Sequence, residues 1–175
     1  MGASIVRSMD HSLAESLMRH ALGVAREGMA AGEAPIGCVI ARGDGSIVAR
    51  AFNEMNGRQC KIAHAEIVAF QRMAGKVPLE ADDLILVSTL EPCVMCTGAA
   101  MEAAVETIVF GLRAPPDNGT SRVSPPQSPE SRTPCIVGDV LAGESRALFE
   151  EWLARNADSK QAAYVKQLLS TTDKR

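Results

Sequence analysis

Two short segments constrain this chain more than any other feature, because they combine metal-binding residue types with signals for helix starts. The first is His64-Ala65-Glu66 and the second is Pro92-Cys93-Val94-Met95-Cys96. One imidazole and two thiolates bind Zn²⁺ well and leave its fourth tetrahedral position for water, which is typical of a catalytic site. The sequence therefore predicts a zinc ion held by His64, Cys93 and Cys96.

Each segment also predicts where a helix begins. Proline suits the first turn of a helix, where the amide N–H has no intrahelical partner, so Pro92 indicates a start next to Cys93. Cys93 and Cys96 would then share one helix face, and the positive helix end would favour their thiolate forms. A second helix is predicted to open at His64. We therefore expect two helix N-termini to converge on the metal, with Glu66 carrying protons for its water.

Either segment alone has other interpretations. A Cys-x-x-Cys pair also occurs in redox centres and structural zinc sites, and a His-x-Glu triplet often arises by chance. A structural zinc site needs a fourth protein ligand, but His11 and His20 fall in an N-terminal helical stretch and the other cysteines show no paired spacing. The order of the segments favours a catalytic site. A non-enzymatic zinc-binding module stays a minor alternative.

With their neighbours, the two segments resemble the cytidine deaminase superfamily, and within it the branch of bacterial guanine deaminases and tRNA adenosine deaminases. The likeness runs from about Leu13 to Leu112 and includes Glu33-Ala34-Pro35-Ile36-Gly37. It implies a three-layer α/β/α domain with a mixed central sheet, one zinc ion per subunit and a homodimer. By position it makes His64, Cys93 and Cys96 the ligands and Glu66 the proton shuttle.

The resemblance also suggests substrate contacts. Asn53 matches an asparagine that hydrogen-bonds the base or sugar, although a plain turn residue at a strand end also fits this position. Ala65 is expected to offer a backbone group to the base. Relatives place an aromatic residue near the base from a C-terminal helix, and Trp152 is the candidate here. A single tryptophan on an apolar helix stripe can equally belong to the core.

The apolar pattern predicts one α/β domain over residues 1–157. A helix is expected from a capping box at Ser12–Glu15 to about Gly32, followed by strands 36–41 and 47–52 around a glycine-rich turn. Strands are also expected at 84–89, 107–110 and 135–140, with a helix at 145–155. Residues 158–175 are interpreted as an exposed or dimer-packing helix or tail. Strands alternating with helices favour a mixed sheet that places ligands beyond the carboxyl ends of its strands.

Residues 113–134 depart from this pattern, because they contain six of the nine prolines. Such a segment cannot form a regular helix or a central strand. A loop of this length is usually functional or disordered, so it is either a lid that sets specificity or a flexible surface loop. It lacks the Lys-Thr-Gly and Gly-Ser pattern that bacterial tRNA adenosine deaminases carry at this place.

Charge and composition weigh against a nucleic-acid substrate. The formal net charge is −3 and the isoelectric point is about 5.6, whereas domains that bind polyanions usually show a basic surface. Aromatic residues make up only 3% of the chain, which leaves few to stack on bases. Five basic residues form either a local patch or ordinary solvated charges, namely Arg50, Arg58, Lys61, Arg72 and Lys76.

We therefore expect a zinc-dependent hydrolytic deaminase acting on a free purine-type nucleobase or nucleoside, guanine-like or adenine-like, with a tRNA-specific adenosine deaminase as the alternative. No apolar run approaches the roughly 18 residues of a membrane span, and residues 1–10 lack the pattern of a secretory signal. Five cysteines are an odd number, and two are assigned to metal, which favours a reducing compartment. A cytoplasmic enzyme without membrane contact is expected.

Overall fold

A mixed five-stranded sheet forms the centre of the molecule in the computed structural model, which describes residues 9–125 and 127–172. Its strands are β1 (Gly37–Ala41), β2 (Ile47–Phe52), β3 (Ile85–Leu90), β4 (Thr107–Leu112) and β5 (Cys135–Val137), in the spatial order β2-β1-β3-β4-β5. β1 runs antiparallel to β2 and β3, whereas β3, β4 and β5 are parallel to one another. β2, β3 and β4 therefore run in the same direction, and their C-terminal ends lie at the same end of the sheet.

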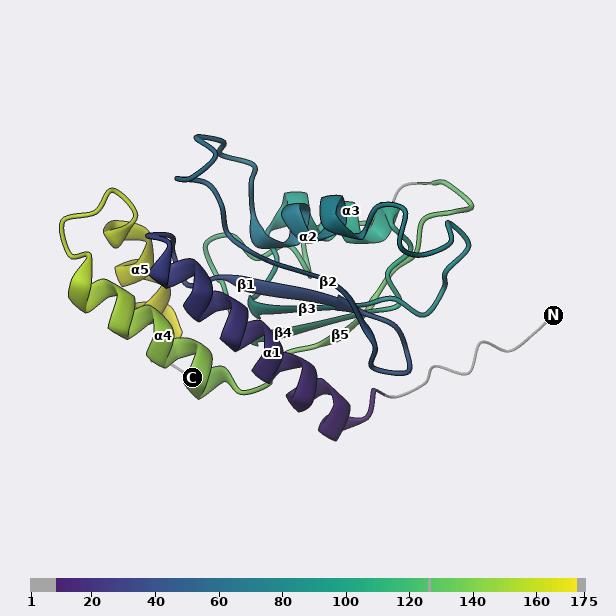
Figure 1. Cartoon of the computed structure of the whole chain (residues 1–175), viewed down its shortest axis with the longest axis horizontal. Coiled ribbons are helices and arrows are strands. Elements are labelled where there is room, and N and C mark those ends of the chain that lie inside the picture. The colour runs from purple at the N-terminus through teal and green to yellow at the C-terminus, as the bar shows by residue number, and fades with distance from the viewer. Residues whose placement is uncertain (1–8, 126, 173–175) are drawn as a thin grey trace.

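Helices cover both faces of this sheet. Figure 1 shows α2 (Ala65–Met73) and α3 (Val94–Glu102) on one side, with α1 (His11–Ala30) and α4 (Ala142–Arg155) on the other. This is the predicted three-layer α/β/α architecture with a mixed sheet. Because β1, β3 and β4 lie between two helical layers, every residue in them is buried.

Alternate residues of each central strand point into different cores. Val39, Val87 and Val109 pack against α1, together with Leu148 of α4. The residues next to them along the strands face α2 and α3 on the other side, namely Ile40, Leu86 and Ile108. This two-residue period sets which strand positions can reach the layer of α2 and α3, where the two motif segments lie.

A third apolar cluster closes the end of the sheet at which β3 and β4 terminate. It joins Leu90 and Leu112 to Phe149 and Trp152 of α4 and to buried residues of α5 (Ala162–Thr172), among them Leu168. The chain's last helix was expected to be exposed or to pack in a dimer, but its apolar face packs against its own chain. α5 therefore forms part of the wall around that end of the sheet.

The helix α1 begins two residues before the predicted capping box. Its N-cap is Asp10, whose carboxylate accepts the amide N–H of Ser12 at 2.8 Å. Ser12 is therefore not the cap, and Glu15 pairs with Arg19 on the helix surface instead of closing a box. No helix in the described ranges, α1 included, is long and apolar enough to cross a membrane.

Strand β5 is shorter than the sequence suggested. It ends at Val137, where residues 135–140 were expected to form one strand. The backbone adopts a left-handed conformation at Asp139 (φ 64°) and again at Leu141 (φ 50°), which breaks the extended course and turns the chain into α4. The short strand still extends the parallel part of the sheet by pairing with β4.

Candidate metal centre and catalytic cavity

Two helix starts bring three soft ligand atoms together. His64 is the N-cap of α2 and Cys93 is the N-cap of α3, and both have extended backbone conformations. Cys96 follows one turn into α3. The Sγ atoms of Cys93 and Cys96 lie 3.5 and 3.6 Å from Nδ1 of His64, and 3.6 Å from each other. The helix on Pro92 therefore starts one residue later than predicted, with the proline outside the cap.

These spacings fit a zinc ion. With Zn–S bonds of about 2.3 Å and Zn–N bonds of about 2.0–2.1 Å, tetrahedral geometry separates the ligand atoms by roughly 3.5–3.8 Å. The three observed distances fall at the lower end of this range. Within the described residues this is the group of histidine, cysteine and acidic side chains that could hold a metal. His64, Cys93 and Cys96 thus form three corners of a tetrahedron.

The two thiols also need a cation for electrostatic reasons. A hydrogen bond from Cys96 lowers the pKa of the Cys93 thiol to about 4, while the same contact and burial raise the pKa of Cys96. Two thiolates at 3.6 Å repel each other strongly, so only one of them is ionised in the absence of a positive charge. A divalent ion at this point stabilises both thiolates together.

Glu66 lies beside the ligands on the first turn of α2. Its side chain is buried, and burial raises the pKa of the carboxyl group above the ordinary value. Its Oε1 accepts the hydroxyl proton of Ser88 on β3 at 2.8 Å, and its Oε2 lies 3.4 Å from the Sγ of Cys96. One oxygen is thus held by the sheet while the other faces the metal site. Such a carboxyl group is suited to proton transfer.

A cavity of about 220 Å³ opens in front of the metal ligands. It lies beyond the C-terminal ends of β2 and β3, between the first residues of α2 and α3. Residues of α4 and α5 form the opposite wall. The wall is mostly apolar, with a few polar groups that converge on the interior, as is usual for sites that bind small molecules. Its lining residues are Ala34, Ile36, Asn53, Met55, His64, Glu66, Leu90, Glu91, Cys93, Asp117, Phe149, Gln161, Tyr164 and Val165.

The start of the proline-rich segment is fastened beside this cavity. Buried Glu91 accepts the amide N–H of Ala114 at 3.2 Å and the hydroxyl proton of Thr120. Gly119 donates its amide N–H to the carbonyl of Pro92 at 2.9 Å, so closely that any Cβ at this position would collide with the backbone of Cys93. Of the described residues in 113–134, Asp117 lines the cavity. The later part of the segment lies elsewhere, against Asp82 and Met101.

Two of the expected substrate contacts have different surroundings. Asn53 lines the cavity and is buried, directly after the end of β2. Ala65 is fully buried, and its side chain packs into the core between α2 and the sheet. Ala65 is not among the residues that line the cavity. Both contacts remain predictions, but the position of Asn53 suits one.

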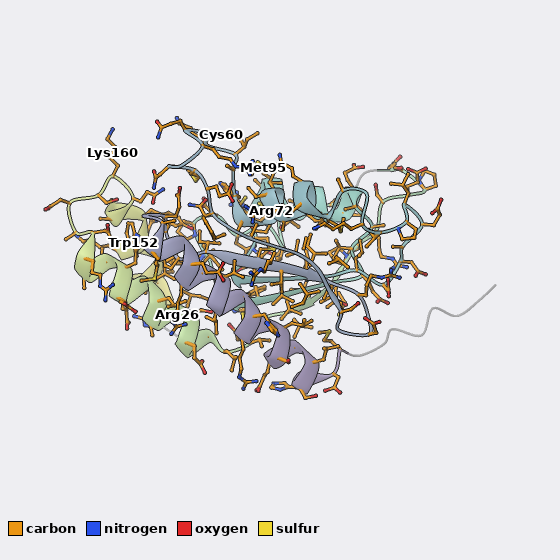
Figure 2. The ribbon with its side chains drawn as sticks, in the orientation of Figure 1. Arg26, Cys60, Arg72, Met95, Trp152 and Lys160 are labelled. Carbon is orange, nitrogen blue, oxygen red and sulfur yellow. The ribbon has the colours of Figure 1, made fainter. Side chains whose placement is uncertain are left out.

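Trp152 is not among the residues that line the cavity. It lies between α4 and the C-terminal end of α1 (Figure 2), in an apolar cluster with Met29. The aromatic side chains at the cavity are Phe149, one helical turn earlier on α4, and Tyr164 on α5. The assignment of Trp152 therefore needs correction, because the helix stripe it belongs to faces the core and only its earlier turn reaches the substrate space.

Tyr164 and Asp117 form a polar pair across the cavity wall that sequence reasoning missed. Burial, together with the hydrogen bond to the Asp117 carboxylate, raises the pKa of the Tyr164 phenol. Tyr164 is the single tyrosine of the chain, and it sits in an apolar helix pattern with Val165 and Leu168. A single polar aromatic residue in an apolar helix was the signal in the sequence from which a role for Tyr164 could have been inferred. For Asp117, in a Pro-Pro-Asp-Asn-Gly sequence, a turn was the obvious interpretation.

A three-ligand zinc site beside a buried carboxyl group, set in an α/β/α fold, defines a hydrolytic zinc enzyme. Residues 11–112 match the family model of the cytidine and deoxycytidylate deaminase zinc-binding region, and the chain belongs to this family of zinc-dependent deaminases. The match spans all three ligands and Glu66.

Relatives with known functions fall into more than one group. The chain is 39% identical over 104 residues to the tRNA-specific adenosine deaminase of Bacillus subtilis, covering 58% of this chain and 63% of that protein. It is 35% identical over 150 residues to the tRNA(Ile)-lysidine synthase of Deinococcus radiodurans, covering 82% of this chain but only 26% of that protein. The chain thus spans less than two thirds of the length of either.

A solved guanine deaminase from Nitrosomonas europaea has the same fold. Its structure superposes with a TM-score of 0.65 at 25% sequence identity and covers 80% of this chain and 84% of that one. The similarity therefore extends beyond the family segment. The comparisons place the chain in the deaminase family and include a guanine deaminase as well as a tRNA-specific adenosine deaminase.

Proposed function

We propose that this protein hydrolyses the exocyclic amine of a free purine-type nucleobase or nucleoside, with a guanine-like base favoured, and releases ammonia. In this reaction water supplies the oxygen that replaces the amino nitrogen on the ring carbon. The observation that supports a small substrate most strongly is the charge of the cavity wall. Among the described lining residues, the carboxyl-bearing side chains are Glu66, Glu91 and Asp117, and no lysine or arginine is present.

A cavity wall that holds carboxyl groups and no lysine or arginine is unfavourable for a polynucleotide. Binding of tRNA depends largely on lysine and arginine contacts with phosphates, which release condensed counterions. Phosphates next to an extruded nucleotide would approach Asp117 and Glu91 at the cavity instead of basic groups. A free base carries no phosphate, so it avoids this repulsion.

The basic residues that could form a patch outside the cavity mostly have acceptors within the chain. Arg58 and Arg72 both pair with Glu54, and Arg50 lies 3.6 Å from Glu27. Lys76 donates to the carbonyl of Val48 at 3.4 Å. Four of the five residues that could have formed a basic patch thus have acceptors within the chain. This pairing supports the interpretation of the group as ordinary surface charge.

The polar groups at the cavity favour a base rich in hydrogen-bond donors. The Asp117 carboxylate and the carbonyl oxygen of Asn53 are acceptors. A guanine-like base carries a ring N–H next to its exocyclic amine, whereas the ring nitrogen at that place in an adenine-like base is an acceptor. The two acceptors therefore match a guanine-like base better, with Phe149 available to pack on the ring.

In the proposed reaction, zinc activates the water, Glu66 transfers protons and Ser88 positions Glu66. When bound, zinc polarises a water molecule and brings its pKa to about 7. Glu66 accepts one proton from the attacking water and passes it to the ring nitrogen. It then accepts the second proton from the hydroxyl group on the ring carbon and passes it to the departing amine, so that ammonia leaves as a neutral molecule. Ser88 holds one oxygen of Glu66 and leaves the other free to move protons.

A tRNA adenosine deaminase is the second candidate, and a specific observation favours it. The similarity to the Bacillus subtilis tRNA-specific adenosine deaminase is 39% over 104 residues. The zinc segments lie within the family region at residues 11–112, which a deaminase of either kind shares. Residues 113–134 lie outside the family segment, which ends at residue 112, and there the sequence lacks the pattern expected for a tRNA adenosine deaminase. The homodimer implied by the resemblance stays a prediction for either function.

The deciding experiment measures ammonia release by the zinc-loaded protein on free guanine, adenine and cytosine, on their nucleosides, and on a tRNA anticodon stem-loop. We expect turnover of guanine or its nucleoside above the other substrates. Glu66→Gln, purified in the same way, is the control, and its ammonia release should fall by about 10²–10⁴. Turnover of the stem-loop alone, with no free base or nucleoside accepted, would replace this proposal with the tRNA function.

A further inference from the structure

Glu33 is a buried acid that does not line the cavity. It lies in the turn between α1 and β1, and only 1% of its surface is exposed. Its Oε2 accepts hydrogen bonds from Nδ2 of Asn53 at 3.2 Å and from the amide of Asn56 at 3.1 Å. Its Oε1 accepts the amide of Gly57 at 2.7 Å. All three donors are neutral N–H groups of the segment that follows β2.

The contact with Asn53 determines which end of its amide faces the cavity. Glu33 accepts this hydrogen bond through a carboxyl oxygen, so the Asn53 side chain turns its NH₂ group toward Glu33. Its carbonyl oxygen is then left for the cavity. The backbone of Asn53 is fixed separately, because its amide donates to the carbonyl of Ile36 at 2.9 Å. Without an acceptor at Glu33, either orientation of the amide would be open.

The same carboxylate ties down the turn beside Asn53. It holds the amides of Asn56 and Gly57, and the Asn56 side chain donates to the carbonyl of Gly32 at 3.3 Å. Met55, which lies between these contacts, lines the cavity. Glu33 therefore anchors a stretch in which two nearby side chains, those of Asn53 and Met55, face the substrate space.

We propose that Glu33 is a positioning residue that acts through Asn53: it presents the Asn53 carbonyl oxygen to an N–H group of the substrate and thereby sets the preference for a donor-bearing base. The proposal rests on the proposed function to the extent that Asn53 contacts the substrate. It assigns Glu33 no contact with the substrate and no part in metal binding.

A double-mutant cycle on kcat/KM tests this role. Glu33→Gln keeps the shape but offers an NH₂ group, which allows the Asn53 amide to turn over. We expect Glu33→Gln to lower kcat/KM about tenfold or more, mainly through KM, as for loss of a hydrogen bond to a charged group. In an Asn53→Ala background the same change should have less than about a twofold effect, because its target is gone. Equal factors in both backgrounds would overturn the proposal.

A charge swap gives a second, independent test. Asn53→Asp alone places two carboxylates against each other and should lower activity further than Glu33→Gln. In the protein that combines Glu33→Gln with Asn53→Asp, the introduced glutamine amide can donate to the new carboxylate, which again shows an acceptor oxygen to the substrate. Activity of the double variant above that of Asn53→Asp supports the proposal. If the activity of the double variant is equal to or lower than that of Asn53→Asp, the proposal is contradicted, whatever the activities of the two single variants.

Two controls separate positioning from general stability. Asp83 also accepts a backbone N–H, that of Gly43 at 3.1 Å, but lies in a different turn from Asn53. In the combination of Asp83→Asn with Asn53→Ala, the change in kcat/KM should therefore equal the product of the two single changes, which means no coupling. Zinc content should stay at one per chain in every variant. The cycle is measured with whichever substrate the ammonia panel identifies, so a result in favour of tRNA leaves the Glu33 test intact. No effect of Asn53→Ala on any substrate would overturn the inference.

Discussion

Ser88 on β3 donates its hydroxyl proton to Oε1 of Glu66 on α2 at 2.8 Å, and both side chains are buried. The strand supplies the donor because Ser88 lies on the face of the sheet that α2 covers. Adjacent Val87 points to the opposite core. The buried hydroxyl of Ser88 therefore holds a carboxyl group next to the metal ligands.

Replacing Glu66 with Gln should leave zinc bound and remove turnover. Glu66 is not one of the three ligand residues, whereas the amide of Gln cannot accept and release the protons that the reaction moves. We expect kcat to fall by about 10²–10⁴, the usual range for loss of a general acid–base group. Metal analysis and initial rates check this together. A variant that keeps more than about a tenth of wild-type kcat would contradict the role of Glu66.

Removing the Ser88 hydroxyl should reduce activity, and a matched control is available in Ser145. We expect Ser88→Ala to lower kcat by about tenfold, because a hydrogen bond to a charged group contributes about 1.5–3 kcal/mol. The hydroxyl of Ser145 is equally buried but has no hydrogen-bond partner in the described part of the chain. Ser145→Ala should keep full activity and raise the free energy of unfolding by about 1 kcal/mol. Equal rates for Ser88→Ala and wild type would remove Ser88 from the mechanism.

Loss of either cysteine ligand should empty the metal site. Cys93→Ala and Cys96→Ala each leave two protein ligands, too few for tight zinc binding. We expect metal content well below one per chain in both, with deaminase activity lost in proportion. Cys60→Ala is the control, since Cys60 is a free thiol outside the ligand group. A full equivalent of zinc in Cys93→Ala or Cys96→Ala would mean that the metal binds elsewhere.

Salt should hardly affect catalytic efficiency. The cavity wall is acidic, and the basic residues nearby are mostly paired with Glu54 and Glu27. For a neutral base we expect kcat/KM to change less than about twofold between ~50 and ~200 mM salt, whereas several phosphate contacts would lower tRNA affinity by ~10²-fold or more. Steady-state rates at constant pH measure this. A steep decline with salt on the stem-loop substrate would favour the tRNA function.

Alkaline pH should loosen the wall formed by α5. Burial and Asp117 raise the pKa of Tyr164 above its ordinary value of 10.0, so the folded protein holds the phenol proton more tightly than the unfolded chain does. This contribution to stability is complete below about pH 10 and is lost as pH rises through the folded-state pKa. Melting temperatures of zinc-loaded wild type should therefore fall more steeply above pH 10 than those of Tyr164→Phe. Parallel curves would show that Tyr164 does not titrate with unfolding.

The metal ligands and the layer order could be predicted from the sequence because their signals are local. His64 and Cys93 each open a helix, and Cys96 follows at the spacing of one turn. The valines and isoleucines of the central strands predict buried strands in the same way. Helix caps were less certain, because Asp10 and Ser12 are both good caps and only the backbone decides between them.

The cavity wall could not be predicted, since it depends on long-range packing. Trp152 and Phe149 belong to the same apolar stripe, and α5 had to be placed before either could be assigned to the substrate space. The pairing of Asp117 with Tyr164 joins a proline-rich loop to a helix that begins 45 residues later, at Ala162. Similarly, no sequence pattern links Glu33 to Asn53, because their contact exists only after α1 and β2 pack side by side.

The contact of Gly119 with Cys93 limits how the proline-rich segment can be exchanged between relatives. Its proline-rich composition and its place beside the cavity make the segment attractive for loop grafting. At position 119, however, even a methyl group would push on the backbone of Cys93. A graft that replaces this glycine would alter metal affinity as well as substrate preference. A screen for new specificity would then reject the graft because it binds metal poorly, even if its substrate preference were the desired one. Libraries built on this scaffold should therefore keep Gly119 and vary the residues on either side.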